Sequence, residues 1–163
     1  MIELAVHWLL GVLAVPKIGL AAVFLVSFIS ATLLPLGSEP LVFAVIKADP
    51  LMYWPVILVA TIGNTLGGMV DYGLGYYAKT AFAKEQETVW FRWLSRFGAK
   101  AMLLAWLPGI GDPMCTVGGW LKLPFWPSVA YMAIGKFLRY VTMTSVLLYL
   151  PDGFWQWLAQ LLS

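Results

Sequence analysis

The chain has very few of the residues that build metal sites and nucleophilic sites. Its 163 residues include one cysteine, Cys115, and one histidine, His7. A single cysteine excludes an internal disulfide and a cysteine-based zinc site. A single histidine argues against histidine-based metal sites and against a Ser-His-Asp triad within one chain. We therefore expect no metal and no cofactor, and we do not expect an enzyme.

Charged residues are also scarce. They make up 11% of the chain, whereas a soluble domain carries about a quarter. Hydrophobic residues account for 61%, and the mean hydropathy is +0.84. Aromatic residues reach 15%, which suits anchoring at membrane interfaces. The net charge is only +2 and no basic stripe follows the chain, so nucleic acid is not an expected partner. The composition indicates an integral membrane protein surrounded by lipids.

A seven-residue pattern, Leu-Pro-x-x-x-acid-Pro, occurs twice among apolar residues. It covers residues 34–40, with Glu39 as the acid, and residues 107–113, with Asp112 as the acid. The surroundings repeat as well: Trp-Pro follows each pattern at almost the same distance, and Gly63-Asn64 matches Gly135-Lys136. Paired broken helices with acids at the breaks are typical of a transporter built from two repeats. The residues expected to form the two breaks are Pro35, Gly37, Pro40, Pro108, Gly109, Gly111 and Pro113.

The apolar runs define the expected helices. Residues 51–70 carry no charge and form the clearest spanning helix. Residues 18–34 either span outright or turn back as the first arm of a re-entrant hairpin, with 41–46 as the returning arm. Residues 101–107 and 114–121 form the arms of a second hairpin. Residues 125–150 are long enough to span but contain two basic residues.

The connection over residues 79–100 holds half of the basic residues, so the positive-inside rule places it in the cytoplasm. Within it, Trp90, Trp93, Leu94 and Phe97 recur at i, i+3, i+4 and i+7. This spacing predicts an amphipathic helix on the membrane surface that ends at Gly98.

The expected architecture is therefore one all-α integral membrane domain of two inverted repeats. Each repeat is a re-entrant helical hairpin plus a transmembrane helix. Repeat 1 covers about residues 18–78 and repeat 2 about 101–150, with the amphipathic linker 79–100 between them. Residues 1–15 form a short helix of the mature protein, and residues 151–163 form an interfacial tail.

Glu39 and Asp112 are the first candidates for chemistry. A carboxylate in a low-dielectric site can bind and release protons near neutral pH, so two such acids at matching positions could drive proton-coupled transport. The alternative is structural. Each acid would cap the second arm of its hairpin, with Pro40 or Pro113 at the first helical position.

Lys136 and Arg139 are the second pair of candidates. They are three residues apart and so share a helix face at membrane depth. Arginine suits bidentate recognition of phosphate, and inward-pointing helix N-termini would favour an anion further. The alternatives are that Arg139 only neutralises Glu39 or Asp112, or that Lys136 extends to the interface.

Asn64 and Asp71 are weaker candidates. Asn64 lines the same cavity or makes a helix–helix hydrogen bond. Asp71 lies near the expected end of its helix, where a solvated surface acid is at least as good an interpretation. Residues 109–112 also fit the Gly-x-Gly-Asp of intramembrane aspartyl proteases, with Asp71 as a partner, but a four-residue match in a glycine-rich chain has little weight.

Several segments together resemble the DedA superfamily of SNARE-associated or VTT-domain membrane proteins, and within it the small YqaA-like branch. The resemblance reaches from about residue 23 to residue 140. The segments that carry it are residues 27–35, 38–39, 63–68, 106–112, 118–120 and 135–140.

The resemblance implies a multi-pass protein of the bacterial inner membrane with two facing re-entrant hairpins and a role in envelope integrity. Relatives recycle undecaprenyl phosphate with proton or sodium dependence, and eukaryotic relatives scramble phospholipids. Glu39 matches the family acid of the first hairpin, and Asn64 stands where many members have Asp. Ala105 and Gly111 stand where typical members have two arginines. Whether Lys136 and Arg139 replace those arginines stays open.

The sequence thus favours a translocator of a lipid or a lipid phosphate, undecaprenyl phosphate-like or phospholipid. Glu39 and Asp112 would couple it to protons, and Arg139 and Lys136 would face the phosphate. Two alternatives remain: a proton-coupled transporter of small solutes or ions, and a non-transporting assembly or scaffold protein. Substrate, coupling ion and homo-oligomerisation stay open.

Overall fold

The computed structural model describes residues 16–32, 37–81, 95–107 and 111–149, and this part of the chain is helical without a strand. The all-α prediction is confirmed for these residues. The elements in order are α2 (Pro16–Thr32), α3 (Glu39–Ala48), η1 (Pro50–Met52), α4 (Tyr53–Ala81), η2 (Gly98–Trp106), α6 (Gly111–Trp120) and α7 (Phe125–Tyr149).

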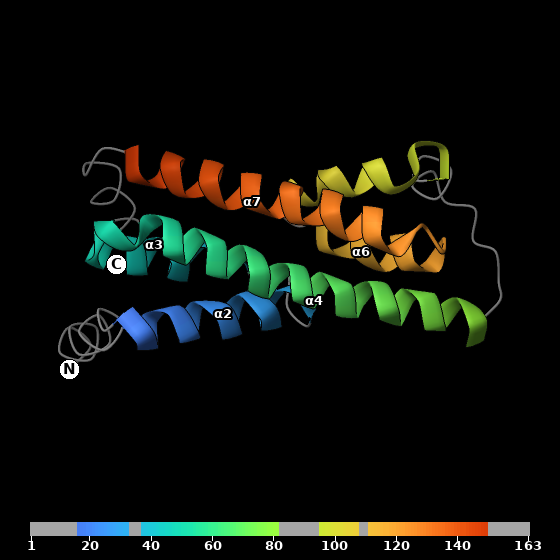
Figure 1. Ribbon diagram of the computed structural model, residues 1–163, viewed down its shortest axis with the longest axis horizontal. Coiled ribbons are helices and arrows are strands. Elements are labelled where there is room, and N and C mark those ends of the chain that lie inside the picture. Colours follow the sequence, from blue (N-terminus) through green and yellow to red (C-terminus); the bar gives the residue numbers. More distant parts are fainter. Residues whose placement is uncertain (1–15, 33–36, 82–94, 108–110, 150–163) are drawn as a thin grey trace, which may run out of the picture.

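Two long helices, α4 and α7, run side by side along the molecule (Figure 1). The shorter helices α2 and α3 lie at one end, and η2 and α6 lie at the other. The first arm of each pair packs on the long helix that follows it in sequence, α2 on α4 and η2 on α7. The second arm of each pair also reaches the other long helix, α3 contacting α7 and α6 contacting α4.

The two matching glycines make matching contacts. A Cβ added to Gly63 of α4 would lie 2.7 Å from the carbonyl oxygen of Phe24 in α2. A Cβ added to Gly135 of α7 would lie 2.5 Å from the carbonyl oxygen of Leu103 in η2. Both positions thus need glycine because a long helix touches the backbone of the arm beside it.

α4 is the one helix within the described residues that is long and apolar enough to cross a membrane, over Pro50–Lys79. This agrees with the prediction for residues 51–70, although the helix continues past Asp71 to Ala81. It continues because Asp71 is buried and does not mark an exit to water. Gly75 does not break the helix either. It is a packing contact, since a Cβ there would overlap the Thr116 carbonyl oxygen of α6. Lys17–Thr32 is a shorter apolar helix.

Several predicted features lie outside the described residues. They are the helix over 1–15, the tail 151–163, most of the amphipathic helix, and the break residues Pro35, Pro108 and Gly109. Gly98 is described and has φ 59°, and the helical turn at 95–97 ends there as predicted. η2 starts at the same residue.

Candidate functional site

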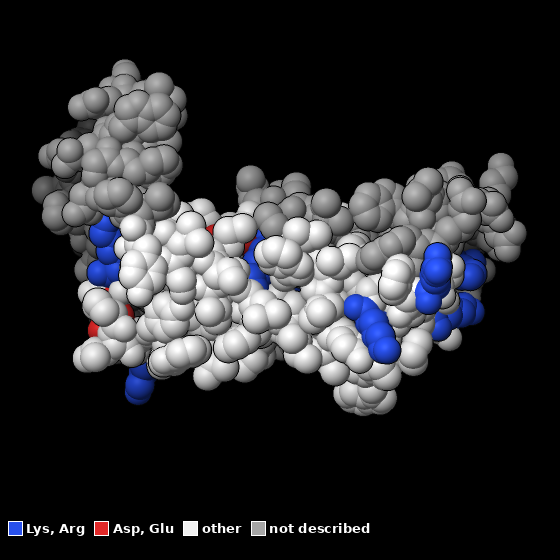
Figure 2. Space-filling view, turned by 90° about the horizontal axis from the view of Figure 1, so that it is seen from above, with Lys and Arg blue, Asp and Glu red and all other residues white. Residues whose placement is uncertain are grey.

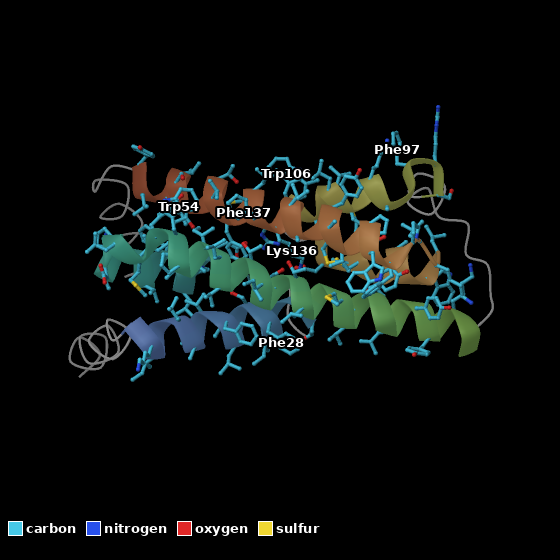
Figure 3. The ribbon with its side chains drawn as sticks, viewed as in Figure 1. Phe28, Trp54, Phe97, Trp106, Lys136 and Phe137 are labelled. Carbon is cyan, nitrogen blue, oxygen red and sulfur yellow. The ribbon has the colours of Figure 1, made fainter. Side chains whose placement is uncertain are left out.

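Charged side chains from three helices meet near the middle of the molecule. Glu39 is the first residue of α3, and Asp112 is the second residue of α6. Lys136 and Arg139 lie one turn apart in the middle of α7. Figure 3 places Lys136 between α7 and α4, near mid-length. The structure thus brings together the four charged residues that the sequence singled out.

Arg139 pairs with the acid at the start of α3. Its Nε donates a hydrogen bond to Glu39 Oε1 at 2.6 Å, and Nη2 forms an ion pair with the same oxygen. Glu39 does not cap α3: Ser38 occupies the N-cap position, Glu39 is the first helical residue, and Pro40 is the second. The capping interpretation is therefore wrong for Glu39, because the carboxylate is directed at α7 instead.

Lys136 pairs with the acid at the start of α6. Its side chain is fully buried, and Nζ donates to Asp112 Oδ1 at 2.9 Å. The same ammonium donates to the backbone oxygen of Asn64 at 2.9 Å and to the Asn64 side-chain oxygen. The idea that Lys136 extends to the membrane interface is therefore wrong.

Arg139 also approaches the second acid. Its Nη1 lies 3.8 Å from Asp112 Oδ2. This nitrogen is buried and, within the described residues, donates no hydrogen bond. One guanidinium thus approaches the carboxylates at the starts of both α3 and α6, and its Nη1 has no hydrogen-bond acceptor in the described part of the chain.

Asn64 makes helix–helix hydrogen bonds, which is one of the two roles that the sequence left open. Its Nδ2 donates to the backbone oxygen of Ser27 at 3.2 Å, which joins α4 to α2, while its two oxygens accept from Lys136. Asp71 is not a solvated surface acid, since it is only 7% exposed. It interacts electrostatically with Asp112 and Lys136. The surface interpretation failed because α6 packs over this part of α4.

Gly37 and Gly111 lie in places where a larger residue would not fit. A Cβ on Gly37 would overlap the Glu39 carboxylate, and a Cβ on Gly111 would overlap the Ala105 carbonyl oxygen. Ala105 and Gly111, the two positions where typical relatives carry arginine, are thus buried against one another. Pro113 is the third residue of α6 and is exposed.

The aspartyl protease interpretation gains no support. That chemistry needs two carboxylates that share a proton. Here Asp112 is bonded directly to the Lys136 ammonium rather than to a second carboxylate. No group of three His, Cys, Asp or Glu suited to a metal ion occurs in the described part of the chain.

Buried hydroxyl groups around the cluster were missed by the sequence reasoning. Ser38 Oγ and the Tyr140 hydroxyl are 2.5 Å apart and hydrogen-bonded. Ser27 Oγ and Thr65 Oγ1 are buried, and neither has a hydrogen-bond partner among the described residues. The available signal was adjacency: Ser38 precedes Glu39, Thr65 follows Asn64, and Tyr140 follows Arg139.

The surface separates charge from apolar area. In Figure 2 most Lys and Arg lie near the two ends, and a small spot of acidic and basic atoms lies near the middle of an otherwise uncharged face. α4 exposes Leu58, Ile62, Leu66 and Val70 in a row. An uncharged band between charged ends is the surface expected of a protein in a bilayer.

No family model and no solved structure matches the chain. Among curated proteins, Inner membrane protein YqaA of Escherichia coli strain K12 is 37% identical over 131 residues, which cover 78% of this chain and 90% of that protein. An uncharacterized protein of Haemophilus influenzae is 38% identical over 133 residues, covering 76% and 84% of the two chains. Uncharacterized membrane protein YbfM of Bacillus subtilis is 28% identical over 134 residues, covering 74% and 83%.

The similarity to the YqaA protein covers most of both chains. With identity above a third over that length, the chain belongs to the YqaA-like branch of the DedA superfamily and is a protein of the bacterial inner membrane.

Proposed function

We propose that the protein moves a lipid or a lipid phosphate across the inner membrane and couples this movement to protons. One observation carries the proposal. Two carboxylates, at the starts of α3 and α6, meet two cations of α7 inside the molecule, and Nη1 of Arg139 has no hydrogen-bond acceptor among the described residues.

Stability gives little reason for such a cluster. Apolar residues of similar volume in place of a buried ion pair are often as stable or more stable. Ionisable residues at membrane depth are costly and mark substrate or ion pathways by default. The side chains of Glu39 and Asp112 keep 14% and 20% of their surface, so both acids remain within reach of water or substrate.

The chemistry of the cluster suits a phosphate. Nη1 of Arg139 belongs to a planar fork and makes no hydrogen bond to the described residues, and a phosphate oxygen is an acceptor that this fork matches well. α3 and α6 both begin beside the cluster, and their N-terminal N–H groups favour an anion. A phosphate entering here would compete with the two carboxylates for Arg139.

That competition supplies the coupling. While Glu39 is ionised, it occupies Nε and Nη2 of Arg139. A proton on Glu39 removes the ion pair and frees the guanidinium for the phosphate, and loss of the proton displaces the phosphate again. Binding of substrate and binding of protons are then linked through one arginine.

We further propose that the two halves are inverted repeats with re-entrant hairpins. Two features support this arrangement. Gly63 and Gly135 make matching contacts, and each second arm contacts the long helix of the other half, α3 on α7 and α6 on α4. α3 and α6 have 10 residues each, about 15 Å of helix, which is half of a hydrocarbon core of about 30 Å. Each hairpin would therefore enter the membrane and return.

The test uses purified protein in liposomes that contain undecaprenyl phosphate, with lipid movement between leaflets measured at several pH values. Wild type should move the lipid, and Glu39→Gln should flatten the pH dependence. Asp49→Asn is the matched control, because it removes a carboxylate outside the cluster while Asn still caps η1.

Lipid movement no faster than in empty liposomes would reject undecaprenyl phosphate as substrate. The same liposomes then test ordinary phospholipids, and uptake of a soluble solute tests the small-solute alternative. A scaffold without transport predicts that Glu39→Gln keeps cellular function as long as the protein folds.

A further inference from the structure

We propose that Asp71 holds a second exchangeable proton of the cluster, beside the one that Glu39 takes up during transport, and that Lys136 moves from Asp112 to Asp71 when the proton on Asp71 leaves. This inference deepens the proposed function, since it rests on proton coupling at the same site. It assigns the proton to a residue of α4 that lies outside both acid-bearing breaks.

The first argument is the count of charges. Glu39, Asp112 and Asp71 are three carboxylates, whereas Lys136 and Arg139 are the two cations among them. Glu39 is paired with Arg139 and Asp112 with Lys136. No ion pair in the described part of the chain includes Asp71. An ionised carboxylate that is 7% exposed and lacks a counter-charge is costly, so this group takes up a proton.

The second argument is the hydrogen bonding of Lys136. An ammonium has three N–H donors. They meet three acceptors: Asp112 Oδ1, the Asn64 backbone oxygen and the Asn64 side-chain oxygen. Lys136 therefore has no donor left for Asp71 in this arrangement. It can bind Asp71 only by giving up one of its present acceptors.

The third argument is position. A Cβ added to Gly68 would lie 3.2 Å from Lys136 Nζ and 3.3 Å from Cys115 Sγ, so the ammonium lies over Gly68. Asn64 is one turn before Gly68 and Asp71 is nearly one turn after it, on the same face of α4. Asn64 and Asp71 are thus about 10 Å apart along the helix, and the ammonium lies between them. Reaching Asp71 from its place over Gly68 takes the ammonium about one turn, roughly 5 Å, past Met132 Sδ, which lies 2.6 Å from the same added Cβ.

The groups that face Asp71 make its ionisation and the movement of Lys136 interdependent. Asp112 and Cys115 of α6 and Lys136 of α7 interact electrostatically with it. Asp112 opposes ionisation of Asp71 and Lys136 favours it. When the proton passes from Asp71 to water, Lys136 stays an ammonium and moves to the new carboxylate. Asp112 is then left to Arg139 Nη1, 3.8 Å away. Arg139 is drawn toward the second hairpin, which changes its hold on Glu39.

Infrared spectroscopy of the purified full-length protein tests this directly. A protonated carboxylic acid has a carbonyl stretch apart from the carboxylate bands, and an ester-free detergent keeps that region clear. Wild type should show the band at neutral pH. Exchanges between Asp and Glu keep the number of carboxyl groups and assign the band to a residue. Asp71→Glu should shift the band, whereas Asp112→Glu and Glu39→Asp should leave it in place. A band that shifts with Asp112→Glu or Glu39→Asp, or no band at all, would overturn the assignment.

Asp112→Asn tests the movement of Lys136. With Asp112 neutral, Lys136 passes to Asp71, which ionises, so the band should disappear. A band that persists in Asp112→Asn would overturn the movement.

Thermal unfolding gives a second readout that does not depend on the band. Asn resembles a protonated Asp in shape and charge. Asp71→Asn should therefore melt close to wild type near neutral pH, whereas Asp112→Asn should melt lower, and the reverse order would overturn the assignment. None of these measurements uses lipid movement. If no lipid movement is measured, the infrared result for Asp71 is unaffected. If no band is seen, the assignment to Asp71 is wrong, whereas the transport assay can still succeed.

Discussion

Arg139 and Asp112 approach one another without forming a hydrogen bond: Nη1 of the arginine lies 3.8 Å from Oδ2 of the aspartate. The other side of the same guanidinium is held by Glu39, at 2.6 Å from Nε. The arginine is thus held at the start of α3 and directed toward the start of α6. A small shift of α3 or α6 would change which acid Arg139 pairs with. Movement of the two halves would therefore be linked to binding at this contact.

The first prediction concerns the shape of this cation. Arg139→Lys keeps the charge but loses the fork that reaches both carboxylates. A hydrogen bond to a charged group contributes about 1.5–3 kcal/mol, so lipid movement should fall about tenfold or more. The rate of movement in liposomes measures the change. Arg96→Lys is the control, because Arg96 is exposed away from the cluster and its replacement should keep the wild-type rate. Equal rates for Arg139→Lys and wild type would show that the fork has no role in transport.

The second prediction separates the supporting hydroxyls from the charges. Tyr140→Phe leaves Ser38 Oγ without its partner at a buried position, which should cost about 1–3 kcal/mol of unfolding free energy. Denaturant unfolding in detergent measures this loss. Tyr149→Phe on the same helix is the control, since Tyr149 is 89% exposed and should change stability by less than about 0.5 kcal/mol. Similar losses in both variants would contradict the role given to the Ser38–Tyr140 bond.

The third prediction concerns the close approach of helices. Gly135→Ala places a Cβ 2.5 Å from the Leu103 carbonyl oxygen, so α7 and η2 must separate at a cost of about 1–3 kcal/mol. Gly63→Ala should act in the same way on α4 and α2. Gly73→Ala is the control, because nothing lies within 4 Å of the added Cβ and alanine is the better helix former. Its stability should be unchanged or up to about 1 kcal/mol higher. If Gly135→Ala were as stable as Gly73→Ala, the tight packing of η2 on α7 would be wrong.

The fourth prediction concerns the lipid-facing side of α4. Ile62 is 54% exposed near the middle of the spanning helix, so Ile62→Lys should cost about 2.5–3.5 kcal/mol of insertion free energy. The fraction of protein recovered in membranes should fall. Leu51→Lys, at the helix start beside Asp49, should have little effect, since Leu51 is 90% exposed near the charged end. Equal recovery of both variants would place Ile62 in a wet environment rather than in lipid.

Much of the site could be predicted because its signals are local. Acids between prolines mark helix starts in an apolar chain, and two cations three residues apart share a helix face whatever the fold. Which cation meets which acid could not be predicted. It depends on where α3 and α6 begin along α7, and that is set by packing between the halves.

Asp71 shows the other limit of the sequence. A charge after a long apolar run is typical of a helix end at the membrane surface. α4 continues instead, because α6 covers it and provides a buried, charged environment for the side chain. The glycines at 73 and 75 strengthened the impression of a helix end, although Gly75 is a packing contact with Thr116.

Lipid movement driven by an imposed pH gradient tests the central claim most directly. Liposomes with wild-type protein and undecaprenyl phosphate in both leaflets would be given a pH difference across the membrane, and the lipid in each leaflet would be measured over time. Proton coupling through Glu39 predicts that the lipid accumulates in one leaflet, and that accumulation stops when a protonophore removes the gradient or when Glu39 is changed to Gln. An equal distribution at every gradient, with or without movement between leaflets, would contradict coupled transport.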